Sequence, residues 1–195
     1  MSDERKPNSG DADAAMQAYK NGDAAAFVVV FEALEVRLFS FLRKQTRHDG
    51  NAEDLVQQTF LRMHENRGRF LDGAAVAPWA FAIARRLYID FYRHERSGIG
   101  PDISTDPDVV ARVEAGIEAN PEEDLAVRET LGRVQKVLEN LPDRQRVAWV
   151  LVRDQGFSNT EAAEMLGETE MTVRMLVHRA CTALRAALAE DGGTK

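Results

Sequence analysis

The spacing of apolar residues constrains the fold of this 195-residue chain more than any other feature. Apolar side chains recur at three- and four-residue steps along most of the chain, and we find no convincing strand alternation. The clearest series consists of Phe27, Val30, Phe31, Leu34, Leu38, Phe41 and Leu42. Because a helix with one apolar stripe must bury it against another element, the chain is predicted to be all-α.

Residues that start and stop helices divide this pattern. Asn21-Gly22 ends a first short helix, and Asp23 and Asn51 are the expected N-caps of the next two. Pro78 is well placed as an early residue of a fourth. The helices are expected at about residues 11–20, from 23, from 51, 77–96, 125–140, 144–154, 159–166 and 169–189.

Charge and composition indicate two domains. The net charge is −7, and residues 98–124 contain eight acids and one base, which accounts for the whole excess. This segment has glycine and proline but few large apolar residues, which is typical of a linker. We therefore expect a disordered tail at 1–10, a helical domain at 11–97, an acidic flexible linker at 98–124 and a second helical domain at 125–190.

Several classes of protein find no support in the sequence. The first ten residues lack the apolar region of a signal peptide, and the longest apolar run, Ala24–Phe31, is too short to cross a bilayer. We therefore expect a cytoplasmic protein without membrane insertion, and the single Cys181 fits a reducing compartment. His178 and Cys181 lack further metal ligands and no catalytic motif is present, so no metal, cofactor or enzymatic activity is expected.

Residues 158–184 have the layout of a helix-turn-helix. Ser158 and Glu161 form a capping box for a short helix, Gly167 ends it, and Thr169 can cap a longer one. The residues expected to face the core are Val173, Leu176, Val177, Ala180 and Leu184. Those left outside are Arg174, His178, Arg179 and Arg185. Such a face can bind DNA, although a plain helical hairpin with a basic face fits the same spacing.

The segment 77–96 combines aromatic residues with arginines: APWAFAIARRLYIDFYRHER. On a helical wheel one stripe contains Phe81, Arg85, Tyr88, Tyr92 and Arg96. The other side, predicted to face the core, contains Trp79, Ala82, Ile83, Leu87 and Phe91. The first stripe suits single-stranded DNA, because bases stack on aromatic rings while guanidinium groups hold phosphates. The alternative is that Tyr88 and Tyr92 half-bury against the first helices while the arginines are solvated.

In the order of its segments the chain resembles the extracytoplasmic-function (ECF) sigma factors, the small two-domain initiation subunits of bacterial RNA polymerase. NAEDLVQQTFLRMH (51–64) is similar to the polymerase-binding helix of that family. Residues 78–96 are similar to the helix that melts the promoter and binds the −10 element. Residues 141–188, beginning LPDRQRVAWVL, are similar to the −35-binding domain.

The resemblance implies roles for individual residues. Core polymerase binding is implied for Asp54, Gln57, Gln58 and Phe60. The loop Leu71–Ala77 lies where the family captures a flipped −10 base, and −10 binding is implied for Phe70, Asp72, Trp79, Arg85, Arg86, Tyr88 and Tyr92. Binding of the −35 element is implied for Thr172, Arg174, Met175, His178 and Arg179.

The resemblance also implies partners. They are core RNA polymerase, promoter DNA that is duplex at −35 and single-stranded at −10, and an anti-sigma factor, with the chain a monomer in the holoenzyme. In the family, the segment that corresponds to residues 98–124 enters the RNA-exit path. The acidic segment is then either an RNA mimic in a positive channel or a solvated tether, and its charge fits both.

Some residues depart from the usual family pattern, and they are Gln58, Arg86, Met171, Met175, Leu176 and Cys181. Leu176 and Cys181 stand where arginines are usual, so we expect weaker or altered −35 binding. Two rival functions stay open, and the missing arginines motivate the first of them. One is a sigma-like mimic that sequesters an anti-sigma factor, and the other is a stand-alone helix-turn-helix regulator.

Overall fold

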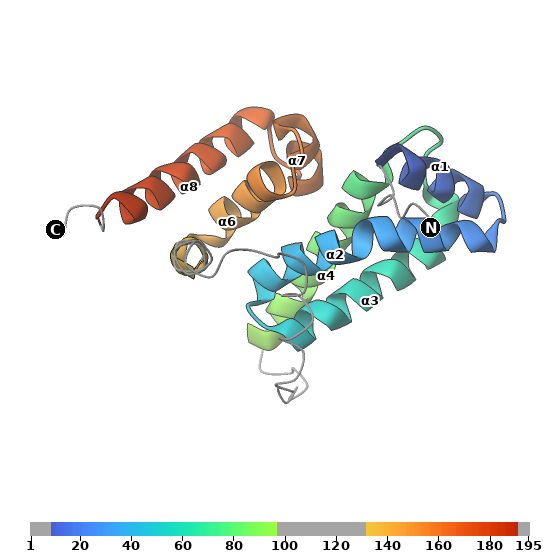
Figure 1. Cartoon of the computed structure of the whole chain (residues 1–195), viewed down its shortest axis with the longest axis horizontal. Coiled ribbons are helices and arrows are strands. Elements are labelled where there is room, and N and C mark those ends of the chain that lie inside the picture. Colours follow the sequence, from blue (N-terminus) through green and yellow to red (C-terminus); the bar gives the residue numbers. More distant parts are fainter. Residues whose placement is uncertain (1–8, 97–131, 191–195) are drawn as a thin grey trace, which may run out of the picture. The chain divides into compact units, whose positions relative to one another are not determined.

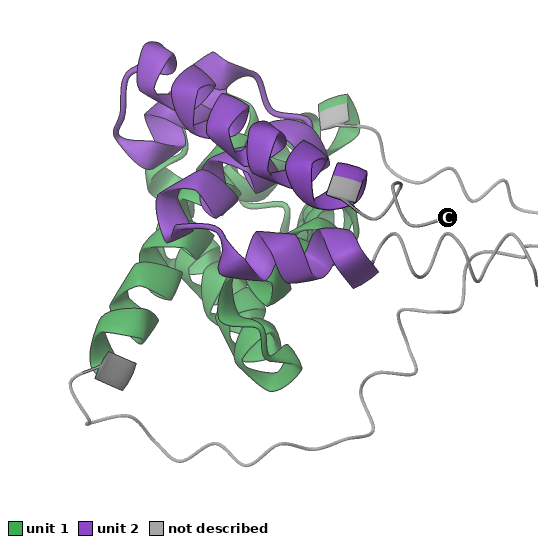
Figure 2. Ribbon diagram, turned by 90° about the vertical axis from the view of Figure 1, so that its left-hand side faces the viewer, with its two compact units in different colours: residues 1–102 green, residues 103–195 purple. Residues whose placement is uncertain are grey.

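The computed structural model describes residues 9–96 and 132–190 (Figure 1). The chain divides into two compact units, residues 1–102 and residues 103–195, which Figure 2 colours separately. Neither described range contains a β-strand, which confirms the all-α prediction. Residues 1–8 of the tail expected at 1–10, and the acidic segment at 98–124, lie outside the described residues, whereas residues 9 and 10 belong to the first helix. Among the described helices, none combines the length and apolar character that a membrane crossing requires.

The described part of unit 1, residues 9–96, contains four α-helices. They are α1 (Ser9–Lys20), α2 (Phe27–Thr46), α3 (Asp49–Glu65) and α4 (Val76–Arg96), with 3₁₀ turns at Ala24–Ala26 and Arg67–Arg69. α2 packs against each of the other three helices. Its buried apolar residues are Val30, Leu34, Leu38, Phe41 and Leu42, which are most of the predicted stripe. Phe27 and Phe31 are half-buried because they lie toward the edge of that face.

The helix boundaries of unit 1 confirm one predicted cap and correct another. The carboxylate of Asp23 accepts a hydrogen bond from the Ala25 backbone N–H (3.0 Å), as expected of an N-cap. Asn51, in contrast, lies inside the first turn of α3, because the chain turns at Arg47, which has a left-handed φ of 61°. α3 therefore begins at Asp49, whose carboxylate pairs with Arg43 (2.5 Å) and suits the positive end of the helix.

α4 buries a different face from the one predicted. Ala80, Phe81, Ala84 and Tyr88 are buried. The residues predicted to face the core are only half-buried, and they are Trp79, Ala82, Ile83, Leu87 and Phe91. The outward placement of Phe81 and Tyr88 was therefore wrong. Small residues at positions 80 and 84 let the neighbouring helices approach this side of α4 closely, and the large rings fill the space beside them.

The surroundings of Phe81 explain its burial. Its ring lies 5.2 Å from the ring of Phe41 on α2, measured between centroids. The guanidinium of Arg37, also on α2, lies over the Phe81 ring at 5.5 Å, and burial lowers the pKa of Arg37. The Phe81 ring is therefore engaged by an arginine within unit 1 and is not available to a nucleic-acid base.

Unit 2 is built from a helix over residues 132–140, α6 (Asp143–Trp149), a π-helical turn (Val150–Asp154), α7 (Asn159–Leu166) and α8 (Glu170–Glu190). α8 packs against both α6 and α7. One core cluster joins Leu138 and Leu141 to Ala180 and Leu184, with Trp149 packed against it. The predicted helix from 144 to 154 is present, but its last turn is π-helical.

Candidate nucleic-acid interface

The turn between α7 and α8 has the geometry of a helix-turn-helix. Ser158 and Glu161 form the predicted capping box: the Ser158 hydroxyl accepts from the Glu161 N–H (3.1 Å), and the Glu161 carboxylate accepts from the Ser158 N–H (2.8 Å). Gly167 ends α7 with a left-handed φ of 64°. The Thr169 hydroxyl then accepts from the Thr172 N–H (3.2 Å) and caps α8. These local bonds fix where α8 begins.

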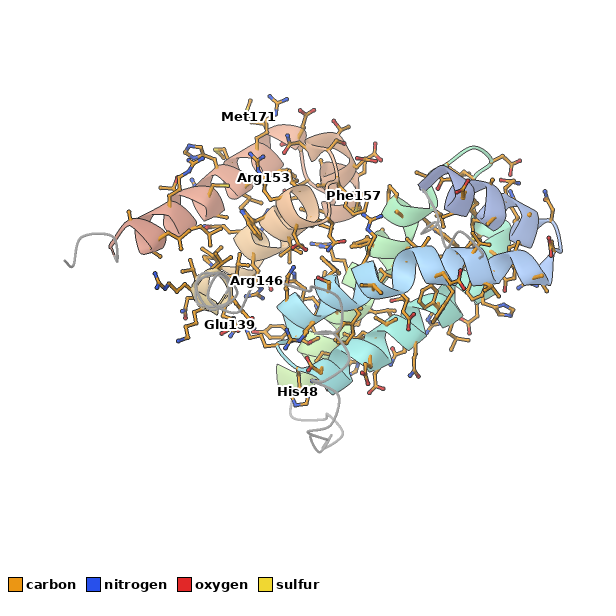
Figure 3. The ribbon with its side chains drawn as sticks, viewed as in Figure 1. His48, Glu139, Arg146, Arg153, Phe157 and Met171 are labelled. Carbon is orange, nitrogen blue, oxygen red and sulfur yellow. The ribbon has the colours of Figure 1, made fainter. Side chains whose placement is uncertain are left out.

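One face of α8 is turned away from the core. Val173, Val177, Ala180 and Leu184 are buried, as predicted, and Leu176 is half-buried. The exposed residues on the other side are Met171, Arg174, Met175, His178, Arg179, Thr182 and Arg185. Figure 3 shows Met171 projecting outward from the start of α8, where 66% of its surface is exposed. Two exposed methionines beside three arginines and a histidine form a face suited to DNA.

The first turns of α8 hold two of the predicted −35 residues by hydrogen bonds. The Arg174 guanidinium donates to the Glu170 carboxylate (2.5 Å) one helical turn earlier. The Thr172 hydroxyl is hydrogen-bonded to that of Thr169 (2.8 Å), and its residue is half-buried. Because the side chains of Arg174 and Glu170 are 61% and 42% exposed, the pair is weak and Arg174 can exchange it for a phosphate.

In unit 1 the predicted −10 residues divide into buried and exposed groups. Phe70 and Tyr88 are buried, at 2% and 4% exposed, so neither ring is free to stack on a base. The Phe70 ring instead packs 5.2 Å from that of Trp79, which is half-buried. The exposed or half-buried candidates that remain on this surface are Asp72, Trp79, Arg85, Arg86 and Tyr92.

The loop over residues 70–76, called the 70–76 loop below, is held by α1. Lys20 donates to the Asp72 carboxylate (2.5 Å) and to the Phe70 carbonyl (2.7 Å), and Gln17 donates to Asp72 (2.9 Å). The hydrogen bond from Lys20, aided by that from Gln17 and by the Lys20 charge, holds the pKa of Asp72 below its usual value. Asp72 therefore carries a carboxylate at neutral pH, and Lys20 offsets its charge.

The predicted polymerase-binding residues lie on α3. Asp54, Gln57 and Gln58 are exposed, but Phe60 is buried between helices, with its ring 4.7 Å from Phe31 and 5.9 Å from Phe27. Phe60 therefore supports the helix from the inside and does not lie on its surface.

Five exposed large apolar residues of the described chain belong to none of the predicted sites, and they are Val28, Val36, Leu61, Met171 and Leu188. Asp54, Gln58 and Leu61 follow one another at steps of four and three residues, so helical periodicity could have added Leu61 to the same surface. Leu71, 74% exposed, lies in the loop Leu71–Ala77, which the resemblance assigned to the flipped −10 base. Within the described ranges no three His, Cys, Asp or Glu side chains are grouped as metal ligands would be.

Comparison with known proteins assigns both units. Residues 30–98 match the family model Sigma-70 region 2, and residues 131–184 match Sigma-70, region 4. The chain is 30% identical to the ECF RNA polymerase sigma factor SigF of Caulobacter vibrioides, over 84% of this chain and 86% of the relative. It is also 30% identical to the RNA polymerase sigma factor CarQ of Myxococcus xanthus, over 90% of this chain and 96% of that one.

Two solved structures share the fold. One is CnrH in complex with the cytosolic domain of CnrY, with a TM-score of 0.68, 23% identity, and coverage of 93% of this chain and 99% of that chain. The other is the sigma factor RpoE in complex with the anti-sigma factor NepR from Bartonella quintana, with a TM-score of 0.65, 23% identity, and coverage of 84% and 96%.

A helical chain whose two units match Sigma-70 regions 2 and 4 is a sigma factor, which is a regulator of transcription. Its full-length likeness to SigF and CarQ narrows the class: the chain belongs to the ECF sigma factors. The resemblance drawn from the sequence alone is thereby confirmed.

Proposed function

We propose that this chain binds core RNA polymerase, directs it to promoters through −10 and −35 elements, and assists melting of the −10 region. The outward face of α8 carries the proposal, because it gathers Arg174, His178 and Arg179 beside the exposed Met171 and Met175. This face begins at a capped turn, so its position relative to the rest of unit 2 is fixed. The side chains of Arg174 and Arg179 are suited to phosphates, and those of the methionines to apolar base edges.

In unit 1 we assign the exposed face of α3 to the polymerase. Asp54, Gln57 and Gln58 offer polar contacts there, and Leu61, 55% exposed, adds an apolar one. The 70–76 loop and the exposed residues Arg86 and Tyr92 are assigned to the separated −10 strand, with Trp79 and Arg85 at its edge. Phe60, Phe70 and Tyr88 support these surfaces from within.

An anti-sigma factor is a further proposed partner. RpoE and CnrH are similar in fold to this chain, and the RpoE structure contains the anti-sigma factor NepR. Catalysis is assigned to the polymerase, and this chain contributes binding, recognition and orientation. Residues 98–124 are proposed to be the acidic connection between a domain over residues 11–97 and one over residues 125–190.

Transcription with purified core polymerase on a pool of genomic fragments tests the proposal. Sequencing the RNA 5′ ends should give starts that depend on this chain and share −10 and −35 motifs. A sigma-like mimic predicts no such starts but tight binding to an anti-sigma protein. A stand-alone regulator predicts specific binding to duplex DNA without polymerase. Absence of chain-dependent starts would therefore refute the proposed function.

The contribution of the methionines can be measured on the promoter found in this way. Replacing a −35 thymine by deoxyuridine removes one methyl group and nothing else. If Met175 contacts that methyl group, we expect affinity to fall about threefold to fourfold, the value of one buried methyl group. Met175→Ser should lose the difference between thymine and uracil, and Lys136→Ala, an exposed change on the helix over residues 132–140, should keep it. Equal binding of both bases by the unaltered chain would exclude the contact.

A further inference from the structure

Helix α1 has two stripes with different partners. Ala12, Met16 and Tyr19 are buried and form its inner stripe. Asp13, Gln17 and Lys20, at spacings of four and three, form a second stripe that hydrogen-bonds to the 70–76 loop and to the start of α4. We call these three residues the α1 polar stripe. Residues 9–20 lie outside the segment, 30–98, that matches Sigma-70 region 2.

At the far end of the loop the α1 polar stripe caps α4. The Asp13 carboxylate accepts a hydrogen bond from the Val76 N–H at 2.7 Å, across 63 residues of sequence. Val76 is the first residue of α4, so its N–H has no partner within the helix. Asp13 supplies that partner and places a negative charge at the positive end of α4. It therefore fixes the point at which the loop ends and the helix begins.

At the near end of the loop Lys20 makes two bonds. Its ammonium group donates to the Phe70 carbonyl at 2.7 Å and to the Asp72 carboxylate at 2.5 Å. Gln17 donates to the same carboxylate oxygen at 2.9 Å. The Lys20 side chain is only 21% exposed, so its ammonium group lies in one place over the loop. The two residues that flank Leu71 are thus bonded to α1, Phe70 through its backbone carbonyl and Asp72 through its carboxylate.

Between these two attachments the loop leaves a side chain outside. Leu71 is 74% exposed, and Gly73 has a left-handed φ of 75°. Phe70 is held underneath against Trp79. A loop that is bonded at both ends and exposed in the middle can receive a planar group without first being ordered.

We propose that Asp13, Gln17 and Lys20 are positioning residues that hold the 70–76 loop in the conformation that receives an unstacked base of the −10 strand. The inference rests on the proposed function and extends it to a helix outside the matched region. Because the loop is ordered when the chain folds, the free-energy cost of ordering it does not reduce the affinity for the base.

A cycle of protein and DNA changes tests this role. The promoter is the one found by mapping transcription starts, and abasic sites are introduced singly through its −10 element. The position whose replacement reduces open-complex formation most with the unaltered chain is used. Lys20→Met and Asp13→Ala should each reduce open-complex formation about tenfold on the intact promoter, the factor of a hydrogen bond to a charged group. On the abasic promoter they should cause no further loss, because no base remains to be positioned.

Conservative variants and a matched control separate positioning from folding. Lys20→Arg keeps a donor and Asp13→Asn keeps the capping acceptor, so both should restore most of the activity. Lys44→Met makes the same change on α2, where Lys44 donates to the Ser40 hydroxyl of its own helix at 3.2 Å, and it should act equally on both promoters. Thermal unfolding of each variant shows whether unit 1 has lost stability.

Three results would overturn the inference. One is an equal loss on intact and abasic promoters, which indicates a structural role alone. The second is full activity of Lys20→Met and Asp13→Ala. The third is that open-complex formation by the unaltered chain does not fall at any abasic site in the −10 element. In each of these cases the unaltered chain still initiates transcription, so the proposed function stands. If the unaltered chain starts no transcripts with core polymerase, both fail together.

Discussion

Replacement of Gly167 by alanine should destabilise unit 2 through the backbone alone. Gly167 has a φ of 64°, and a Cβ added there would meet nothing within 4 Å, so no steric clash contributes. The left-handed conformation costs a non-glycine residue roughly 1–2 kcal/mol. Alanine also restricts the unfolded chain, which offsets about 0.4–1 kcal/mol. The free energy of unfolding should therefore fall by about 1 kcal/mol.

The two tryptophans of the chain provide the assay. Trp79 lies in unit 1, and Trp149 packs against the core of unit 2, so a Trp79→Phe background makes fluorescence specific for unit 2. With a urea dependence of about 1–2 kcal/mol per molar, the midpoint should fall by about 0.5–1 M. Gly167→Asn should lose less than Gly167→Ala, because asparagine adopts the left-handed conformation more readily.

A second glycine in the same unit is the matched control. Gly132 lies in the helix over residues 132–140, and a Cβ there would also meet nothing within 4 Å. Its replacement by alanine should raise the free energy of unfolding by up to about 1 kcal/mol, and with it the urea midpoint, because alanine favours the helix. If Gly167→Ala raised the midpoint as well, the argument from the left-handed turn would be wrong.

Three further changes test the surfaces and the loop. Phe60→Ala should lower the free energy of unfolding of unit 1 by about 3–5 kcal/mol, because it empties a buried site. Gln58→Ala, an exposed change, should leave that stability unchanged and reduce only the ability of the chain to compete for core polymerase. Equal unfolding midpoints for the two variants would contradict the assignment. Arg174→Ala should lower promoter affinity and reduce the slope of log affinity against log salt by about 1, measured by filter binding of the holoenzyme, and an unchanged slope would remove Arg174 from the phosphate contacts. Because the pKa of Asp72 is lowered in the folded chain, its carboxylate stabilises the fold at a pH above the ordinary aspartate value of 3.8, and this stability is lost as the pH falls below that value. The difference in melting temperature between the unaltered chain and Asp72→Asn should therefore shrink on acidification. A difference that widened on acidification would contradict this argument.

Local chemistry made the helix-turn-helix predictable from sequence. Ser158 and Glu161 satisfy each other's backbone N–H groups within four residues, and Gly167 ends the helix at the next left-handed position. Each of these contacts needs only neighbours along the chain, so the residue types alone specify it. The hydrogen bond between the Val76 N–H and the Asp13 carboxylate spans 63 residues, so no local pattern could predict it.

The buried face of α4 was mispredicted because residue class was given more weight than size. The aromatics and arginines suggested a surface for nucleic acid, yet the two alanines of α4 that are fully buried, Ala80 and Ala84, lie outside the predicted core face. Phe81 and Tyr88 flank those alanines in the helical period and are buried with them. The inner face is rotated by roughly a third of a turn from the predicted one.

The corrected face changes how unit 1 would hold a separated strand. With Phe70, Phe81 and Tyr88 inside, a continuous ladder of stacked rings along α4 is excluded, and Tyr92 is the ring most exposed, at 46%. Under the proposed function affinity would then come from a short site, in which the tied 70–76 loop and the exposed Leu71 are assigned to one base and the exposed Arg86 to the DNA backbone. A short site gains more from rigidity than a long one, because fewer contacts must repay the ordering of the loop. The bonds from α1 to this loop are therefore placed where loss of order would reduce binding most.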